Sequence, residues 1–292
     1  MSKKICTGDL PRIHALLRQA VGKSDYTDLR RMGGLTNRTY RADFPDGTKY
    51  VIRIPGEGTE EMIVRADERI STELACSLGI DTPLLCFDDD GAKVSEFIHG
   101  AVTMSSETMK EPHRIEQAAA LLRILHNCGE DTGVPFEVFN MARSYESIIK
   151  SKNVPMFGDY SDTKATVMDI KRELDAQGMS GKVPCHNDPL CENWVVSDTD
   201  RLYLIDWEYA VMQDPHVDVA MFAIYAMYDR ENVDRLIDAY FDGKCPDETR
   251  IKIYCYIAVC GLLWSNWCEY KHGFRHICGR TVSLCGRVQF DC

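Results

Sequence analysis

The hydrophobic and polar positions follow two different periods along the chain. Up to about residue 97, short β-like runs are separated by turn residues, a pattern typical of β-strands. The expected strands are DLRRM (28–32), NRTYRADF (37–44), KYVIRI (49–54), PLLCF (83–87) and AKVSEF (92–97). PDGT joins the second and third runs and indicates a hairpin.

One helix is expected within this strand-rich part. Thr59 is a candidate N-cap, because Glu60 and Glu61 follow it as an acidic first turn. Gly79 would end the helix shortly after Ser77. The pattern therefore predicts a helix from about residue 59 to residue 77.

From residue 111 onward, apolar residues recur every three or four positions, which favours helices. The expected helical runs are RIEQAAALLRILHN (114–127), ATVMDIKRELDAQG (165–178), DVAMFAIYAMY (218–228), VDRLIDAYF (233–241) and IKIYCYIAVCGLLWSNWCEYK (251–271). Two strand-like runs, WVVS (194–197) and RLYLID (201–206), flank a turn among these helices. We predict an α+β chain with a small β-rich lobe at 1–97 and a larger helical lobe at 98–292.

Composition narrows the class of protein. The 292 residues are 45% hydrophobic, which is enough for a sizeable buried core, and the net charge of -11 disfavours nucleic acid and anionic membranes as partners. The longest apolar runs are too short for a membrane span, and MSKKICTGDLPR has no signal-peptide core. The thirteen cysteines are odd in number and form no CxxC pair, so we expect mostly buried free thiols and a cytoplasmic protein.

Two polar stretches, HNDPLCEN (186–193) and LIDWEYA (204–210), lie between apolar runs. A hairpin between them would return Asp206 close to Asp188 and Asn193. Two carboxylates and an amide then offer hard oxygen ligands for Mg²⁺ and a carboxylate that can accept a proton. Either stretch alone is compatible with a surface turn, but their order, H-x-D-x₄-N followed by I-D-W-E, favours phosphoryl transfer.

These stretches resemble the catalytic loop of the aminoglycoside phosphotransferase and choline kinase superfamily, small-molecule relatives of protein kinases. HND with LIDWEYA is most similar to choline and ethanolamine kinases, and the resemblance covers nearly the whole chain. It implies a bilobal protein-kinase-like fold, with Asp188 as the base that faces the acceptor hydroxyl. It also implies that Asn193 and Asp206 hold Mg²⁺, that His186 is structural and that Asp218 buttresses the catalytic loop.

The strand-rich lobe is expected to bind the nucleotide. Gly33 and Gly34 lie between two strands, where backbone amides can approach phosphates. In the protein-kinase pattern, a Lys of the third strand pairs the α- and β-phosphates. Arg53 takes that place here, a substitution that resembles choline kinases rather than aminoglycoside enzymes. Either Glu68 or Asp67, both on the following helix, would orient Arg53.

The segment SEFIHG resembles the hinge on which such kinases hold adenine through backbone hydrogen bonds. The resemblance implies contacts at Glu96 and Ile98. The cofactors expected from this lobe are therefore ATP and Mg²⁺.

A quaternary ammonium acceptor has no hydrogen-bond donors, so its site needs aromatic faces and nearby negative charge. Trp264 and Trp267 share one helical face, and LLWSNWCEY resembles the choline-kinase helix whose two tryptophans wall the choline pocket. On spacing alone the pair is equally compatible with core packing. Tyr209 follows Asp206 by three positions and is a third candidate wall.

Other residues are candidates to complete this aromatic box, namely Glu208, Tyr225 and Tyr228. Choline kinases of animals carry an acidic residue near the position of Tyr225, which leaves the preference between choline and ethanolamine open. We predict an ATP-dependent choline kinase. The alternatives are an ethanolamine kinase, an aminoglycoside or other small-alcohol phosphotransferase, and a non-catalytic nucleotide- or choline-binding module.

Overall fold

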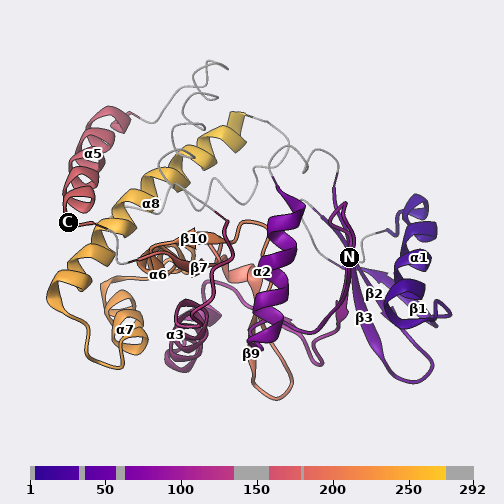
Figure 1. Ribbon diagram of the computed structural model, residues 1–292. Helices are drawn as coiled ribbons and strands as arrows, with labels where there is room; N and C mark the ends of the chain where they lie inside the picture. The colour runs from indigo at the N-terminus through magenta and orange to yellow at the C-terminus, as the bar shows by residue number, and fades with distance from the viewer. Residues whose placement is uncertain (1–3, 33–36, 57–62, 135–157, 179–180, 274–292) are drawn as a thin grey trace. The chain divides into compact units, whose positions relative to one another are not determined.

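The computed structural model describes residues 4–32, 37–56, 63–134, 158–178 and 181–273 (Figure 1). The chain divides into two compact units. The first consists of Met1–Met104 and Glu192–Ala210, and the second consists of Ser105–Cys191 and Val211–Cys292.

The first unit contains a five-stranded antiparallel sheet in the order β1-β2-β3-β5-β4. Its strands are β1 (Asp28–Arg31), β2 (Arg38–Asp43), β3 (Lys49–Ile54), β4 (Leu84–Phe87) and β5 (Lys93–Glu96). All five predicted strands are confirmed within a residue or two of their expected ends. The hairpin at PDGT is also confirmed, because Phe44 N–H donates to the Thr48 carbonyl at 2.9 Å.

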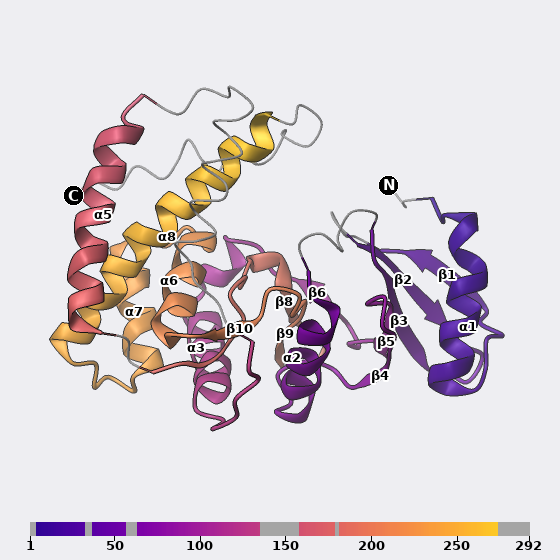
Figure 2. The same ribbon diagram turned by 45° about the horizontal axis from the view of Figure 1, so that its top comes forward.

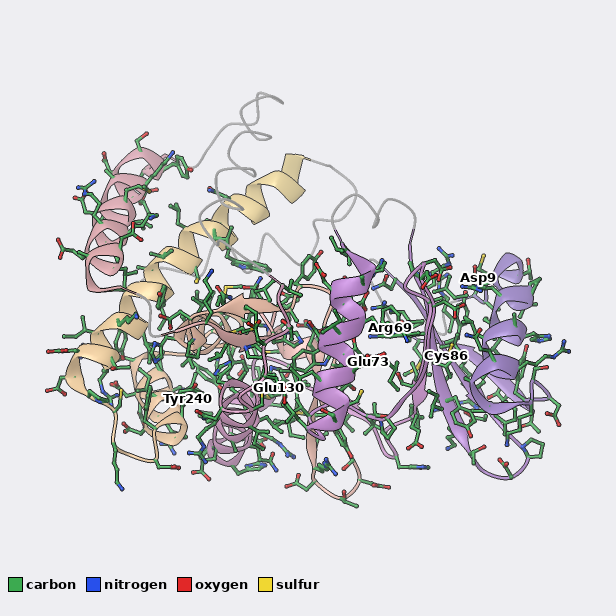
Figure 3. All side chains as sticks on the ribbon, in the orientation of Figure 1. Asp9, Arg69, Glu73, Cys86, Glu130 and Tyr240 are labelled. Carbon is green, nitrogen blue, oxygen red and sulfur yellow. The ribbon has the colours of Figure 1, made fainter. Side chains whose placement is uncertain are left out.

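Two helices cover opposite faces of this sheet, α1 (Leu10–Val21) and α2 (Arg65–Ser77), as both views show (Figures 1 and 2). The buried side of α1 consists of Ile13, Leu16 and Leu17, which join the core that the sheet forms. Asp9, at the start of α1 (Figure 3), accepts hydrogen bonds from the side chains of Arg38 and Tyr40 on β2. These bonds fix the helix along the sheet.

Two expectations for this part were wrong. The structure adds α1 to the single predicted helix, because LPRIHALLRQAV places its buried apolar residues at helical spacing after a proline in the first turn. The other helix, α2, begins at Arg65 rather than near Thr59, since Val64 has an extended backbone. Thr59 itself lies outside the described residues. The predicted end is confirmed, as Gly79 adopts a φ of 69° just past Ser77.

The first unit also contains a three-stranded sheet of β6 (Val102–Thr103), β8 (Trp194–Val196) and β9 (Leu202–Leu204). Hydrogen bonds tie the β8–β9 hairpin to the earlier chain: Met104 N–H donates to Trp194 O at 2.9 Å, and Leu204 N–H donates to Ile80 O at 3.1 Å. The hairpin is as predicted. We had expected it in a lobe beginning at residue 98, whereas it groups with the strand-rich unit.

The second unit is mainly helical. Its elements are η3 (Thr108–Lys110), α3 (Pro112–His126), α5 (Tyr160–Gln177), β7 (Val183–Cys185), η4 (Cys191–Asn193, at the boundary), β10 (Val211–Gln213), α6 (Pro215–Tyr225), α7 (Arg230–Tyr240) and α8 (Asp247–Gly273). All five predicted helices are confirmed, but the β7–β10 pair was not predicted. Helix α6 is buried along nearly its whole length and packs against α8, which α5 flanks (Figure 2).

Asp214 anchors this helical packing. It caps α6 by accepting from His216 N–H, and its buried carboxylate also pairs with Lys252 Nζ at 2.8 Å and accepts from Tyr256 of α8. On sequence alone, an aspartate directly before Pro215 is equally typical of a turn residue.

Two general expectations can be compared with the described residues. Nine cysteines have described side chains and all are free, as predicted, but only Cys86, Cys185, Cys191 and Cys260 are buried, whereas most were expected to be; the others are Cys6, Cys76, Cys128, Cys245 and Cys255. None of the helices in this part of the chain has the length and apolar character that a membrane crossing requires.

Replacement of a core residue of α1 tests the role of this unpredicted helix. Leu16 is fully buried, so Leu16→Ala should lower the free energy of unfolding by about 2–5 kcal/mol through lost transfer energy and a cavity. Arg18→Ala, on the exposed side of the same helix, should change it by less than about 0.5 kcal/mol. Urea unfolding measures both, and equal effects would contradict the packing of α1 against the sheet.

Candidate active site

A buried carboxylate shapes the loop that carries Asp188. Asp218, on α6, is fully buried and accepts hydrogen bonds from the backbone N–H groups of His186 at 2.6 Å and Asn187 at 2.7 Å. His126 of α3 approaches the same carboxylate through Nε2 at 3.2 Å. Asp218 therefore binds the loop directly, as the resemblance implied.

The same loop has a constrained backbone. Asn187 adopts a φ of 62°, which is uncommon for a residue with a side chain, and its Oδ1 accepts from Gln213 Nε2 at 2.6 Å. Asp188 N–H donates to His186 Nδ1 at 3.2 Å. The fully buried His186 therefore helps to fix the backbone at Asp188, in line with the structural role expected of it.

An aromatic pair adjoins Asp188 within the second unit. The Tyr225 hydroxyl donates to Asp188 Oδ1 at 3.2 Å, and the Tyr225 ring meets the Trp264 ring edge-to-face at 4.8 Å between centroids. Trp264 is partly exposed. A carboxylate, a phenol and an indole thus form one continuous group of contacts.

The other candidates for the aromatic box have different outcomes. Tyr228 was expected to line it, but its hydroxyl donates to the Met109 carbonyl and its ring packs against Phe222, so it is a packing residue. The side chain of Trp267 lies outside the described residues. Tyr209 belongs to the first unit, and its convergence with Tyr225 stays a prediction.

The metal-binding candidates lie together on the β8–β9 hairpin of the first unit. Ile205 N–H donates to the Asn193 carbonyl at 2.9 Å, which brings Asn193 next to the chain at Asp206. Asp206 has a φ of 73°, in the left-handed region, and its side chain is 38% exposed. The predicted proximity of Asn193 and Asp206 is confirmed, whereas the proximity of Asp188, in the second unit, stays a prediction.

Trp207 anchors the strained backbone at Asp206. Its indole is 1% exposed and donates through Nε1 to Asp81 Oδ2 at 3.1 Å and to the Leu204 carbonyl at 3.2 Å. Burial raises the pKa of the Asp81 carboxyl to about 6, although hydrogen bonds from Thr82 and Trp207 oppose the shift. The indole therefore stabilises the ionised form of a buried acid.

An ion network surrounds Arg53 on β3. Its Nη1 lies 2.5 Å from Glu68 Oε1 and 3.4 Å from Asp206 Oδ1, and its Nη2 donates to the Gly91 carbonyl at 2.8 Å. Burial opposes the charge of Arg53, but the carboxylates outweigh it and raise its pKa. Glu68 is thus the partner of Arg53, and the alternative Asp67 is not.

Glu208 belongs to this same network. Its carboxylate accepts from Asn37 Nδ2 at 3.0 Å and lies 3.7 Å from Arg53 and 3.5 Å from Arg65. Burial raises the pKa of the Glu208 carboxyl, and the charge of Asp206 raises it further. Its expected place in the acceptor box stays a prediction.

The remaining nucleotide candidates lie on the connection after β5. Glu96 N–H donates to Pro83 O at 3.0 Å, and its carbonyl accepts from the Thr82 hydroxyl. The Ile98 carbonyl accepts from Ala101 N–H, and its own N–H has no backbone partner among the described residues. Gly33 and Gly34 lie outside the residues that the structure describes.

The acidic groups of the first unit fit a hard divalent cation. Single carboxylate oxygens of Glu68, Asp206 and Glu208 all lie within 4.8 Å of one another, and oxygen donors are what Mg²⁺ requires. Arg53 and Arg65 already neutralise Glu68 and Glu208 in part. Asp206, which is more exposed, is the carboxylate best able to reach a bound ion.

Sequence reasoning missed several members of this site. Arg65 and Lys93 both approach Glu68. Asn37 binds Glu208, and Asp81 binds Trp207. In a single sequence, these charged and polar residues cannot be distinguished from residues on a solvated surface. The sequence offered one signal, the alternation along β5. It places Lys93 on the strand face opposite to the buried Val94.

Comparisons with known proteins extend over most of the chain. The sequence model of the choline/ethanolamine kinase family matches residues 30–255. Protein LicA of Haemophilus influenzae is 30% identical over 244 residues, 78% of this chain and 88% of its own.

Two solved structures are similar in fold. A choline/ethanolamine kinase family protein from Mesorhizobium loti has a TM-score of 0.81 at 30% identity, covering 94% of this chain and 90% of its own. The choline kinase LicA from Streptococcus pneumoniae has a TM-score of 0.79 at 28% identity, covering 96% and 97%. The predicted α+β, protein-kinase-like fold is confirmed.

The bond between Trp207 and Asp81 predicts a pH-dependent loss of stability. Trp207→Phe removes a donor from a buried carboxylate, which should cost about 1–3 kcal/mol when that carboxylate is ionised. Because the pKa of Asp81 is about 6 in the folded protein, the loss should be larger at pH 8 than at pH 5, where the acid is mostly protonated.

Urea unfolding of both proteins at the two pH values measures this difference. Tyr228→Phe is a matched control, since it removes a hydroxyl that donates to an uncharged carbonyl, and its effect should not vary between pH 5 and pH 8. A Trp207→Phe effect that is the same at both pH values would remove the role assigned to Asp81.

Proposed function

The chain belongs to the choline/ethanolamine kinase family and is a phosphotransferase that acts on an alcohol; from this premise we propose that it transfers the γ-phosphate of ATP to the hydroxyl of choline. The observation that carries the proposal is the hydrogen bond from Tyr225 to Asp188, together with the contact of the Tyr225 ring with Trp264. It combines a proton acceptor with aromatic surface, which is what a hydroxylated quaternary ammonium ion requires.

Asp188 would act as the base for the acceptor hydroxyl. Its position is fixed from behind by the buried Asp218 and His186, and its Oδ1 is oriented by Tyr225. Phosphoryl transfer depends mainly on such positioning, because the protein forms no covalent bond to the transferred group. A carboxylate held in one orientation can take the hydroxyl proton as the new bond forms.

The first unit would bind the nucleotide. Arg53 is proposed to pair with the phosphates, supported by its burial beside Glu68 and by its Nε, which has no hydrogen-bond partner among the described residues. The backbone at Glu96 and Ile98 is proposed to hold the base, and the loop at Gly33 and Gly34 to cover the phosphates. A LicA structure at 27% identity and a TM-score of 0.73 contains AMP.

Asn193 and Asp206 are proposed to hold Mg²⁺, which would neutralise phosphate charge during transfer. Their adjacency on the hairpin and the exposure of the Asp206 carboxylate support this assignment. ATP as co-substrate, together with the free cysteines, favours a cytoplasmic location. No nucleic-acid partner is proposed, given the net charge of -11.

Ethanolamine is the second candidate acceptor. Trp264 and Tyr225 favour choline, because three methyl groups add apolar contact and the primary ammonium of ethanolamine is costlier to desolvate. The charge of Asp188 is shared by both acceptors and does not discriminate between them.

Removal of the proposed base should separate chemistry from binding. Asp188→Asn keeps an oxygen that can accept from Tyr225 but cannot take a proton, so kcat should fall about 100-fold or more. The affinity for Mg²⁺·ATP, measured by calorimetry, should stay nearly unchanged. Asp162→Asn, exposed on α5, serves as the control. Near-normal turnover in Asp188→Asn would exclude the role of base.

An acceptor panel tests the substrate. ADP release measured with choline, ethanolamine and kanamycin should favour choline over ethanolamine by about 10- to 1,000-fold in kcat/KM, since each buried methyl contributes somewhat under ~1 kcal/mol. Trp264→Ala should lower choline turnover far more than ATP binding, whereas Tyr228→Phe should not alter acceptor preference. Robust ADP release with kanamycin and none with choline would overturn the choline proposal and leave the phosphotransferase fold standing.

A further inference from the structure

The first unit carries an arginine that none of the proposed steps uses. Arg65 is the first residue of α2, and its side chain is only 9% exposed. Its Nη1 lies 2.6 Å from Glu68 Oε2 and 3.5 Å from Glu208 Oε2. One guanidinium therefore contacts two of the three carboxylates that approach Arg53.

The two oxygens of Glu68 are divided between different cations. Oε1 faces Arg53 at 2.5 Å and Lys93 at 3.5 Å, while Oε2 faces Arg65. Burial alone would raise the pKa of Glu68, but Lys93, Arg53 and Arg65 together lower it. Glu68 thus stays ionised with a side chain that is 0% exposed.

Three carboxylates attract the guanidinium of Arg53. Glu68, Asp206 and Glu208 lie 2.5, 3.4 and 3.7 Å from its Nη1. A phosphate that binds Arg53 has to replace part of this attraction. Because buried carboxylates without partners attract the nearest cation strongly, a second cation that takes up Glu68 Oε2 and Glu208 leaves Arg53 available to the ligand.

The position of Arg65 is built into the fold. Its side chain lies across Gly91, where a Cβ would come within 2.4 Å of Arg65 Cδ. The Gly91 carbonyl also accepts from Arg53 Nη2 at 2.8 Å. The same glycine therefore binds Arg53 and leaves room for Arg65, and the two arginines meet different oxygens of Glu68.

We propose that Arg65 is a positioning residue for nucleotide binding, which neutralises Glu68 and Glu208 so that Arg53 can pair with the nucleotide phosphates. The inference rests on the proposed phosphate role of Arg53. Arg65 acts through these two carboxylates and not on the acceptor. Its loss should therefore weaken nucleotide binding and leave acceptor binding unchanged.

Arg65→Met tests the inference, because methionine keeps much of the apolar stem and removes the charge. Calorimetry with ADP in the presence of Mg²⁺ should give a Kd about tenfold higher than for the wild type, as expected for residues coupled in one ion network. KM for ATP should rise in parallel while KM for the acceptor stays constant. Arg65→Lys should recover most of the affinity.

Arg69→Met is the matched control. Arg69 lies one turn further along α2 (Figure 3), pairs with Glu73 at 2.8 Å, and has a side chain that is 51% exposed. Its ADP affinity should equal that of the wild type. If Arg65→Met does not fold, Arg65→Gln and Arg65→Lys can be compared instead, since only Arg65→Lys keeps the positive charge.

A double-mutant cycle separates action through Arg53 from a direct contact with phosphate. In the Arg53→Ala background, Arg65→Met should change the ADP Kd by less than about twofold, because no cation remains to be captured. If the effects of Arg53→Ala and Arg65→Met on the ADP Kd multiply, or if Arg65→Met and Arg69→Met bind ADP equally well, the inference is overturned. The phosphate role of Arg53 would then still stand. Unchanged ADP binding in Arg53→Ala would overturn the phosphate role of Arg53 and the inference with it.

Discussion

A carboxylate that is withdrawn from water must find cations or hydrogen-bond donors inside the protein, and the functional parts of both units depend on this constraint. In the first unit, Glu68 meets it with Arg53, Arg65 and Lys93. In the second, Asp218 meets it with two backbone N–H groups of the loop that carries Asp188 and with a histidine. The groups that satisfy the buried acids are thereby fixed, and they include or adjoin the residues proposed to act on ATP and on the acceptor.

The two left-handed residues of the candidate site are supported in the same way. Asn187 precedes Asp188, and Asp206 is itself the proposed metal ligand; their φ angles are 62° and 73°. Such conformations persist only where neighbouring contacts over-determine them. Asp218 provides those contacts for the catalytic loop, and the Trp207 indole, held by Asp81, provides them beside Asp206. The support for each strained residue thus comes from a buried carboxylate that is distant in sequence.

Local patterns were sufficient for most elements and insufficient for most charged contacts. KYVIRI predicted β3 because its β-branched residues and the following turn act locally. The order of HND and IDWE pointed to Asp188, Asn193 and Asp206 as candidates, of which the structure brings Asn193 and the chain at Asp206 together. Glu68 could not be separated from Asp67, because which of two adjacent acids is buried depends on how α2 meets the sheet. The direction of Glu208 likewise depends on Asn37, a residue 171 positions away in sequence.

The close approach at Gly91 restricts the order in which substitutions can accumulate in this chain. A side chain at position 91 has no room while Arg65 lies across it, and Gly91 also has a φ of 87°, which disfavours other residues. A shorter residue at position 65 would have to come first, and it would leave Glu68 without one of its cations. A substitution at position 91 therefore depends on a prior change at position 65, which lies 26 residues earlier in the chain.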